Sequence, residues 1–252
     1  MKYGKYNEQI NFMIESVLLG ERVVKNNRHL RVMDKGKFDI VTNVDLEIET
    51  LILKRLKKAF PDIPIVSEEF NDFEEVPEKC FVIDPVDGTK NFYHRLPTWG
   101  IQMAYVENGS PVASVLYCPE LGIDVVAGDD IGVYVNDKRV SYERKDLEHS
   151  MVVLDGPKRH RWNVMQRLDQ EVQCIRMLGS TCVGFSLVAS GKIEGYVYMC
   201  KHTWDLLPGL CAARNAGLYV YDHNQRMAIV ANSPQLLEFM KKTVLEEIAK
   251  DQ

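Results

Sequence analysis

Long apolar runs are missing from this sequence, and their absence excludes two classes of protein. No stretch reaches the roughly 20 apolar residues that a membrane-spanning helix needs. The polar start of the chain, residues 1–8, lacks the apolar core of a secretion signal. We therefore expect a cytoplasmic protein with no membrane partner.

Cysteine pairs of the CxxC type are also missing. The chain has six cysteines, scattered along its length, and several lie in apolar runs, as Cys118 does. This pattern favours buried, reduced thiols over disulfides or a zinc site. We find no internal repeat, no low-complexity segment and no Gly/Ser-rich linker. A length of 252 residues with 46% hydrophobic residues suits one large domain or two interlocked ones.

The chain has no excess of basic residues. Lysine and arginine number 31 against 36 acidic residues, which gives a net charge of -5. We expect no nucleic-acid partner, because phosphate backbones attract basic surfaces. The same charge is unfavourable for an anionic substrate, unless metal cations reverse the sign of the local charge.

The N-terminal half predicts two helices packed on a largely antiparallel sheet. Apolar residues recur at close to helical spacing over residues 7–25 and 44–60. A buried strand is expected over residues 80–83, ending at Asp84. Four more strands, separated by turn residues, are expected at 100–106, 111–117, 122–127 and 132–135.

The C-terminal part, after about residue 142, alternates between strand and helix patterns and predicts a layered α/β half. The expected strands are 151–154, 173–178, 195–199, 218–221 and 228–230. The expected helices are 161–168, 181–190, 205–216 and 234–250. We place a boundary in the polar run near Lys145, which divides the chain into domains 1–145 and 146–252.

The most informative segment is DPVDGT at residues 84–89. Its proline favours an extended Asp84, so the chain turns sharply after the buried strand. Carboxylates at Asp84 and Asp87 can then converge, which is unfavourable unless a cation lies between them. Gly88 permits close backbone approach, and a helix that begins at Thr89 could present N–H groups to an anion. The alternative is an ordinary Asx turn.

Three other segments place acidic residues where elements begin or end. Glu68 and Glu69 follow an apolar segment, Asp205 stands at the start of an apolar helix, and Asp45 ends the segment DIVTNVD. Taken singly, each has a structural explanation. These are a solvated glutamate pair, a helix N-cap at Asp205, and a first-turn position for Asp45 behind a threonine or asparagine cap.

Taken together, the segments resemble the inositol monophosphatase family. It lies within the lithium-sensitive phosphatase superfamily, with fructose-1,6-bisphosphatases and 3′-phosphoadenosine phosphate phosphatases. DIVTNVD is similar to the family's DLVTxxD, SEE at 67–69 to GEE, and DPVDGT to DP[IL]DGT. The segment 178–180 resembles its substrate-side loop, and WDLLPG at 204–209 its WDxxxG. The resemblance covers nearly the whole chain and implies an α+β fold, a layered αβαβα sandwich.

The resemblance also implies a Mg²⁺-dependent phosphomonoesterase with two or three ions per subunit. Glu68, Asp84 and the carbonyl of Val86 correspond to the ligands of the first ion. Asp84, Asp87 and Asp205 correspond to those of the second, and Asp87 and Asp205 are also expected to contact substrate. Mg²⁺ prefers such hard oxygen ligands. Bound cations also resolve the charge problem, because they mask the carboxylates and bind phosphate oxygens.

The mechanism that the resemblance implies is attack by a metal-activated water, without a phosphoenzyme. Asp45 and Thr89 form the pair that orients or deprotonates this water. Glu68, the third expected catalytic residue, also contacts a labile third ion. The N–H groups of Gly88 and Thr89 bind the phosphate. Lithium is expected to inhibit by competing at a metal position.

The substrate is the least determined part of the prediction. Gly179, Ser180 and Thr181 correspond to the family's substrate loop. Members that favour inositol phosphates carry a glutamate seven residues before the WD aspartate, and Tyr198 stands there in this chain. Tyrosine can donate one hydrogen bond to a substrate, or simply pack within a strand.

We expect a small phosphate monoester such as inositol monophosphate. Fructose-1,6-bisphosphate, a 3′-phosphonucleotide or NADP are the alternatives, and a non-catalytic binding module is the alternative of another class. Family members are commonly homodimers, so we expect a homodimer. The first domain is then expected to carry most metal ligands, and the second Asp205 and the substrate loop.

Overall fold

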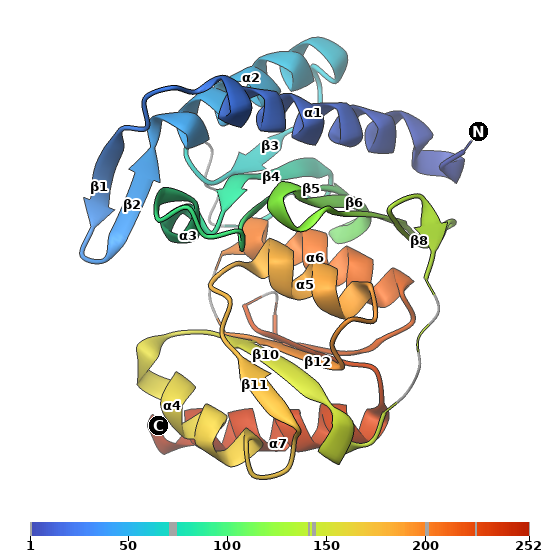
Figure 1. The fold of residues 1–252 in the computed structure, drawn as a ribbon. Coiled ribbons are helices and arrows are strands. Elements are labelled where there is room, and N and C mark those ends of the chain that lie inside the picture. The colour runs from blue at the N-terminus through green and yellow to red at the C-terminus, as the bar shows by residue number, and fades with distance from the viewer. Residues whose placement is uncertain are drawn as a thin grey trace.

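Five layers of helices and sheets make up the protein, as the computed structural model shows in Figure 1. The structure describes residues 2–70, 75–140, 142, 145–199, 202–224 and 226–251. Helices cover one face of a seven-stranded sheet, two helices lie between it and a five-stranded sheet, and further helices cover the far face. The predicted αβαβα sandwich is thereby confirmed. Cys200 lies outside the described residues.

The seven-stranded sheet carries the first part of the site. Helices α1 (Asn7–Asn26) and α2 (Asn43–Ala59) pack on its outer face. Strand β3 is parallel to β4, and all later neighbours are antiparallel. In spatial order the strands are β3 (Ile65–Ser67), β4 (Cys80–Asp87), β5 (Gly100–Glu107), β6 (Ser110–Cys118), β7 (Ile123–Gly128), β8 (Gly132–Val135) and β9 (Lys138–Arg139).

Strand β4 is buried along its whole length, and its side chains alternate between two cores. Phe81 and Ile83 belong to the core under α1 and α2. Cys80 and Val82 belong to the core on the opposite face, around α5 and α6. Because side chains alternate along a strand, Asp84 also faces α5 and α6.

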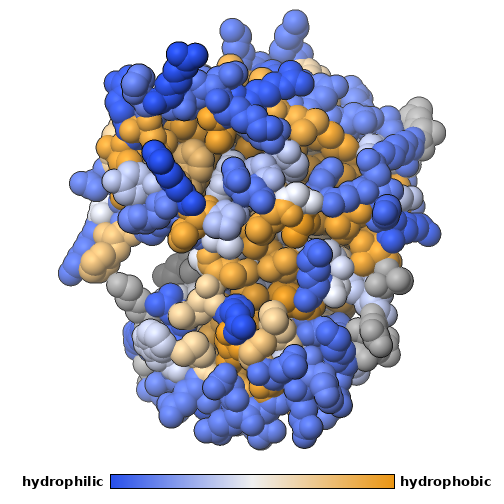
Figure 2. All heavy atoms as spheres, viewed as in Figure 1, coloured by the Kyte–Doolittle hydropathy of each residue, from blue (hydrophilic) through white to orange (hydrophobic). Residues whose placement is uncertain are grey.

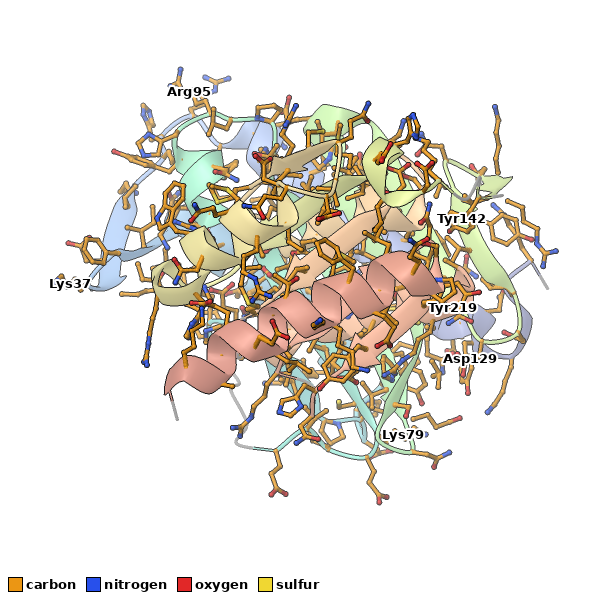
Figure 3. All side chains as sticks on the ribbon, turned by 90° about the horizontal axis from the view of Figure 1, so that it is seen from below. Lys37, Lys79, Arg95, Asp129, Tyr142 and Tyr219 are labelled. Atoms are coloured by element: carbon orange, nitrogen blue, oxygen red, sulfur yellow. The ribbon has the colours of Figure 1, made fainter. Side chains whose placement is uncertain are left out.

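The five-stranded sheet forms the second half of the sandwich. Helices α5 (Thr181–Ala189) and α6 (Thr203–Asn215) lie between the two sheets. Helices α4 (Lys158–Leu168) and α7 (Pro234–Ile248) cover the outer face, which Figure 3 shows from below. In spatial order the strands are β11 (Cys174–Arg176), β10 (Met151–Asp155), β12 (Gly195–Tyr198), β14 (Ala228–Ala231) and β13 (Tyr219–Asp222).

The surface follows this layering. Figure 2 shows hydrophilic residues over the outer helices and hydrophobic residues in the band between them. Among the described residues, no helix is both long and apolar enough to cross a membrane.

Several expected boundaries were wrong. A hairpin of β1 (Val32–Gly36) and β2 (Asp39–Thr42) was not predicted, because all five residues of β1 are exposed and show no alternation. Helix α4 begins at Lys158 rather than at residue 161, and α6 at Thr203 rather than 205. The helix expected to begin at Thr89 is present as the short helix α3 (Thr89–Tyr93), which follows β4. Single 3₁₀ turns occur at Gly4–Tyr6, Pro119–Leu121, Leu147–His149 and Ala249–Asp251.

The proposed domain boundary near Lys145 falls between the two sheets, after β9 and before β10. The core around α5 and α6 is shared by both halves, since it contains Val82 of the first sheet and Tyr196 of the second. The division into domains 1–145 and 146–252 therefore stays a prediction.

Candidate active site

Asp84 and Asp87 face the same side of the sheet because β4 has a bulge between them. In the pairing of β4 with β5, Asp84 lies opposite Gln102 and Asp87 lies opposite Gly100. Three steps along β4 are thus matched by two along β5. In a regular strand, residues three apart point to opposite faces. The extra residue of the bulge brings both carboxylates to the face that α5 and α6 cover.

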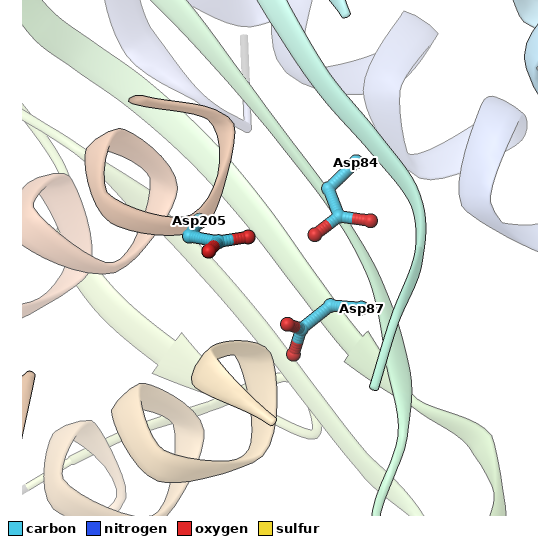
Figure 4. A group of neighbouring side chains, drawn as sticks. All are labelled: Asp84, Asp87 and Asp205. Atoms are coloured by element: carbon cyan, nitrogen blue, oxygen red, sulfur yellow. The ribbon is translucent and has the colours of Figure 1, made fainter. Parts of the chain in front are cut away.

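Asp205 completes a cluster of three carboxylates at this position. One oxygen of each of Asp84, Asp87 and Asp205 lies within 4.8 Å of the others. Figure 4 shows the three side chains converging from β4 and from the start of α6. Asp205 is the third residue of α6, and His202 occupies the N-cap position. The explanation of Asp205 as a helix cap is therefore wrong.

The cluster is electrostatically unfavourable without a cation. Burial raises the pKa of Asp84 well above its usual value, and the nearby Glu68, Asp87 and Asp205 raise it further. Burial followed by the charge of Asp87 does the same for Asp205. Oδ1 of Asp84 is buried and has no hydrogen-bond partner among the described residues.

Asp87 is held by the beginning of α5. Ser180 Oγ donates to Oδ2 of Asp87, Thr181 Oγ1 donates to Oδ1 at 3.1 Å, and the Cys182 N–H donates to Oδ2 at 2.6 Å. Burial raises the pKa of Asp87, while the bonds from Ser180 and Cys182 oppose that rise. The expected substrate loop is thus joined to a carboxylate of the cluster.

Asp45 and Thr89 form the predicted pair. Thr42 caps α2 in a capping box with Asp45, as one of the two cap alternatives expected. Oδ1 of Asp45 lies 3.1 Å from Thr89 Oγ1, which also lies 3.0 Å from the carbonyl oxygen of Val86. Burial raises the pKa of Asp45 to about 6. This carboxylate can therefore exchange a proton near neutral pH.

Glu68 lies beyond the three-carboxylate group but lines the same pocket. Its Oε1 is 3.2 Å from Nζ of Lys35, which reaches the site from the β1–β2 hairpin and also pairs with Glu69 at 2.7 Å. Burial raises the pKa of Glu68 to about 7, and Lys35 opposes this rise. The explanation of the two glutamates as a solvated pair is therefore wrong.

The pocket, with a volume of ≈ 350 Å³, has the cluster in its wall. Its lining residues come from β2, the turn after β3, the β4–α3 segment, the substrate loop and the start of α6. They are Asp39, Glu68, Asp84, Val86, Asp87, Gly88, Thr89, Lys90, Gly179, His202, Trp204 and Asp205. Most of the expected site residues are thus gathered in one place.

Four of the expected residues do not line the pocket. Asp45 stands behind Thr89, while Ser180 and Thr181 are buried against Asp87. Tyr198 is 1% exposed, and its hydroxyl donates to Oδ2 of Asp205 at 2.8 Å. In this geometry Tyr198 supports Asp205 from behind the pocket wall, and its role as a substrate contact stays a prediction.

Sequence reasoning missed four lining residues: Asp39, Lys90, His202 and Trp204. Lys90 pairs with Asp39 at 3.2 Å, and the rings of His202 and Trp204 stack with centroids 4.8 Å apart. All four lie inside or next to the motif segments. Their position in the motifs was therefore an available signal.

The residues present fit divalent metal ions. The donor set consists of carboxylate oxygens together with the nearby Val86 carbonyl, which are the hard ligands that Mg²⁺ prefers. One of these oxygens, Oδ1 of Asp84, has no hydrogen-bond partner among the described residues and is therefore available to a metal ion. A carboxylate cluster that lines a pocket is the arrangement typical of metal-dependent hydrolytic enzymes.

The chain belongs to the inositol monophosphatase family, which it matches over residues 8–251. It is a phosphatase. A fructose-1,6-bisphosphatase/inositol-1-monophosphatase of Thermotoga maritima is 32% identical over 194 residues, covering 77% of this chain and 75% of the relative. Nus factor SuhB of Xylella fastidiosa is 30% identical over 226 residues, covering 84% and 81%. A solved IMPase from Thermotoga maritima superposes with a TM-score of 0.84 at 27% identity, covering 98% of each chain.

Proposed function

We propose that this phosphatase hydrolyses a small phosphate monoester, such as inositol monophosphate, with two or three Mg²⁺ ions. Glu68, Asp84, the Val86 carbonyl, Asp87 and Asp205 hold them. The observation that carries the proposal is the buried cluster with an unpaired oxygen on Asp84. When bound, Mg²⁺ offsets the charge of the carboxylates, binds phosphate oxygens and lowers the pKa of a water molecule.

The charge of the pocket supports a requirement for cations. Of the lining residues that the structure describes, five are acidic and Lys90 is the only lysine. A phosphate dianion is repelled from such a pocket unless cations reverse the sign of the local potential. The mildly acidic composition and an anionic substrate are then compatible.

The proton of the attacking water passes to the Asp45–Thr89 pair. Thr89 lines the pocket, and its Oγ1 lies within hydrogen-bond distance of Asp45 Oδ1. Thr89 can accept a hydrogen bond from water while it donates to Asp45. The N–H groups of Gly88 and Thr89, at the turn that leads into α3, are the proposed donors to the phosphate.

The size of the pocket favours a small substrate. A volume of ≈ 350 Å³ is near the lower end of the range of about 300–1,000 Å³ for small-molecule sites. A sugar phosphate or inositol phosphate can be accommodated in such a volume. The name of the Thermotoga maritima relative supports fructose-1,6-bisphosphate as the second candidate.

A substrate panel tests the proposal. Phosphate release is measured from inositol 1-phosphate, fructose-1,6-bisphosphate, a 3′-phosphonucleotide and NADP, each with Mg²⁺, with EDTA, and with Mg²⁺ plus Li⁺. We expect Mg²⁺-dependent release that is highest for one of the first two and is reduced by Li⁺. The highest rate on NADP would contradict the small-substrate proposal, and release in EDTA would contradict the metal site.

A homodimer is proposed from the family resemblance. Light scattering of the purified protein measures the mass in solution directly. A monomeric mass would contradict this part of the proposal and would leave the proposed reaction unaffected.

A further inference from the structure

Helix α2 carries two buried carboxylates on one face. Asp45 and Glu49 are four residues apart, a spacing that places side chains on the same side of a helix. Both are 0% exposed. Asp45 contacts Thr89 and has a role in the proposed reaction. Glu49 has none, and a carboxylate buried so completely is costly unless its oxygens are hydrogen-bonded.

Among the described residues, the hydrogen-bond partners of Glu49 all belong to the turn 67–70, which carries Glu68. Oε1 of Glu49 accepts a hydrogen bond from Ser67 Oγ at 2.5 Å and one from the Phe70 N–H at 2.9 Å. Oε2 accepts one from the Glu69 N–H at 3.0 Å. Three of the four residues of the turn 67–70 are therefore bound to one carboxylate. The side chain of the fourth, Glu68, lines the pocket.

Glu68 also has an ion-pair partner, Lys35, that lies on a different part of the chain from Glu49. Lys35, on the β1–β2 hairpin, lies within 3.2 Å of Glu68 and 2.7 Å of Glu69. Strand β1 is exposed along its length, so Lys35 reaches the turn from a hairpin at the surface of the protein. If Lys35 were the only contact of the turn 67–70, the position of the turn would depend on the position of the hairpin. Glu49 instead ties the turn to a helix that packs against the seven-stranded sheet.

We propose that Glu49 is a positioning residue that fixes the turn 67–70, so that the Glu68 carboxylate faces the metal position. Ser67, which stands where the family pattern has glycine, supplies one of the three bonds that do this. The inference rests on the proposed function only in that Glu68 is taken as a metal ligand. Helix α2 thereby aligns Asp45 and Glu68, which are 23 residues apart in the chain.

The test is Mn²⁺ binding without substrate, measured from the free-ion signal in electron paramagnetic resonance. The variant is Glu49→Gln, because an amide offers one acceptor oxygen and turns N–H groups toward the remaining donors. We expect Mn²⁺ affinity to fall about 10- to 100-fold, the usual effect of losing a hydrogen-bond partner that orients a metal ligand. Glu47→Gln, an exposed position on the same helix, is the matched control and should bind like the wild type.

Two further measurements separate positioning from a purely structural role. Thermal unfolding in EDTA reports folding alone, so a structural role lowers the melting temperature but leaves Mn²⁺ affinity of the folded protein unchanged. Ser67→Ala removes the hydrogen bond from Ser67 to Glu49 and leaves the two backbone bonds, so it should weaken Mn²⁺ binding in the same direction by a smaller factor, even if Glu49→Gln does not fold. Unchanged affinity in the folded variants, with the wild type binding Mn²⁺, overturns the role of Glu49 alone. A wild type that does not bind Mn²⁺ overturns the proposed function as well.

Discussion

Tyr198 donates a hydrogen bond of 2.8 Å to Oδ2 of Asp205 from the end of β12. The bond fixes the orientation of one carboxylate of the cluster. Tyr198→Phe should therefore weaken Mg²⁺ activation about tenfold, at the lower end of the effect of losing such a partner. The KM for substrate at saturating Mg²⁺ should stay as in the wild type.

The measurement is phosphate release over a matrix of Mg²⁺ and substrate concentrations. Tyr196→Phe, which removes a buried hydroxyl that bonds Asp155 instead, is the control. If Tyr198→Phe raised KM at saturating Mg²⁺ and left Mg²⁺ activation unchanged, the original expectation of a substrate contact would regain support.

Thr89 lines the pocket, and its hydroxyl is hydrogen-bonded to Asp45. Thr89→Val keeps the shape of the side chain and removes this hydroxyl, whereas Thr89→Ser keeps it. We expect kcat of the valine variant to fall by about 10²- to 10⁴-fold, the usual contribution of a positioned acid–base group. The serine variant should retain most activity. Steady-state kinetics checks this, with Thr50→Val on the exposed face of α2 as control; equal losses in both Thr89 variants would argue for a packing role.

The stability of the metal-free protein should fall as pH rises. Burial raises the pKa of Asp45 to about 6 and that of Glu68 to about 7, so the folded state binds more protons than the unfolded state below those values. The free energy of unfolding should therefore decrease from about pH 4 to about pH 7. Asp84 and Asp205, with pKa values raised well above the usual ones, act in the same direction.

Urea unfolding in EDTA across this pH range measures the effect. Mg²⁺ binds the deprotonated carboxylates, so excess Mg²⁺ should stabilise the protein most at the upper end of the range. A metal-free protein that became steadily more stable over the same range would show that these carboxylates are not held in the unfavourable environment described.

The layers and most elements were predictable, because hydrophobic periodicity and turn residues mark them locally. The β1–β2 hairpin was not predictable, since β1 is exposed on both faces and has no hydrophobic alternation. Its pairing with β2 is made by the backbone and leaves no side-chain pattern in the sequence. The convergence of Asp84 and Asp87 was expected from a turn. The structure shows a bulge against β5, and the register of a neighbouring strand cannot be seen in a local motif.

Site residues that belong to the motifs were predictable. Residues that only position a motif residue through a hydrogen bond were harder to predict. Asp205 was placed by its motif, yet the position of Tyr198 behind it depends on how β12 meets α6. The sequence did contain a signal for Glu49: it follows Asp45 by one helical turn, so both side chains lie on the same face of α2. This spacing was not used in the prediction. Its partners lie after β3, and only the packing of α2 on the sheet brings them together.

The Asp84→Asn variant tests the central claim most directly, through phosphate release as a function of Mg²⁺ concentration. Asp62→Asn, at an exposed position, is the control. We predict that the wild type and the control release phosphate only with Mg²⁺. Losing a residue that only hydrogen-bonds a metal ligand lowers activity about 10- to 100-fold. Asp84→Asn removes a proposed ligand itself, so it should lower activity by more than that. Release without Mg²⁺, or a fully active Asp84→Asn variant, would contradict the account.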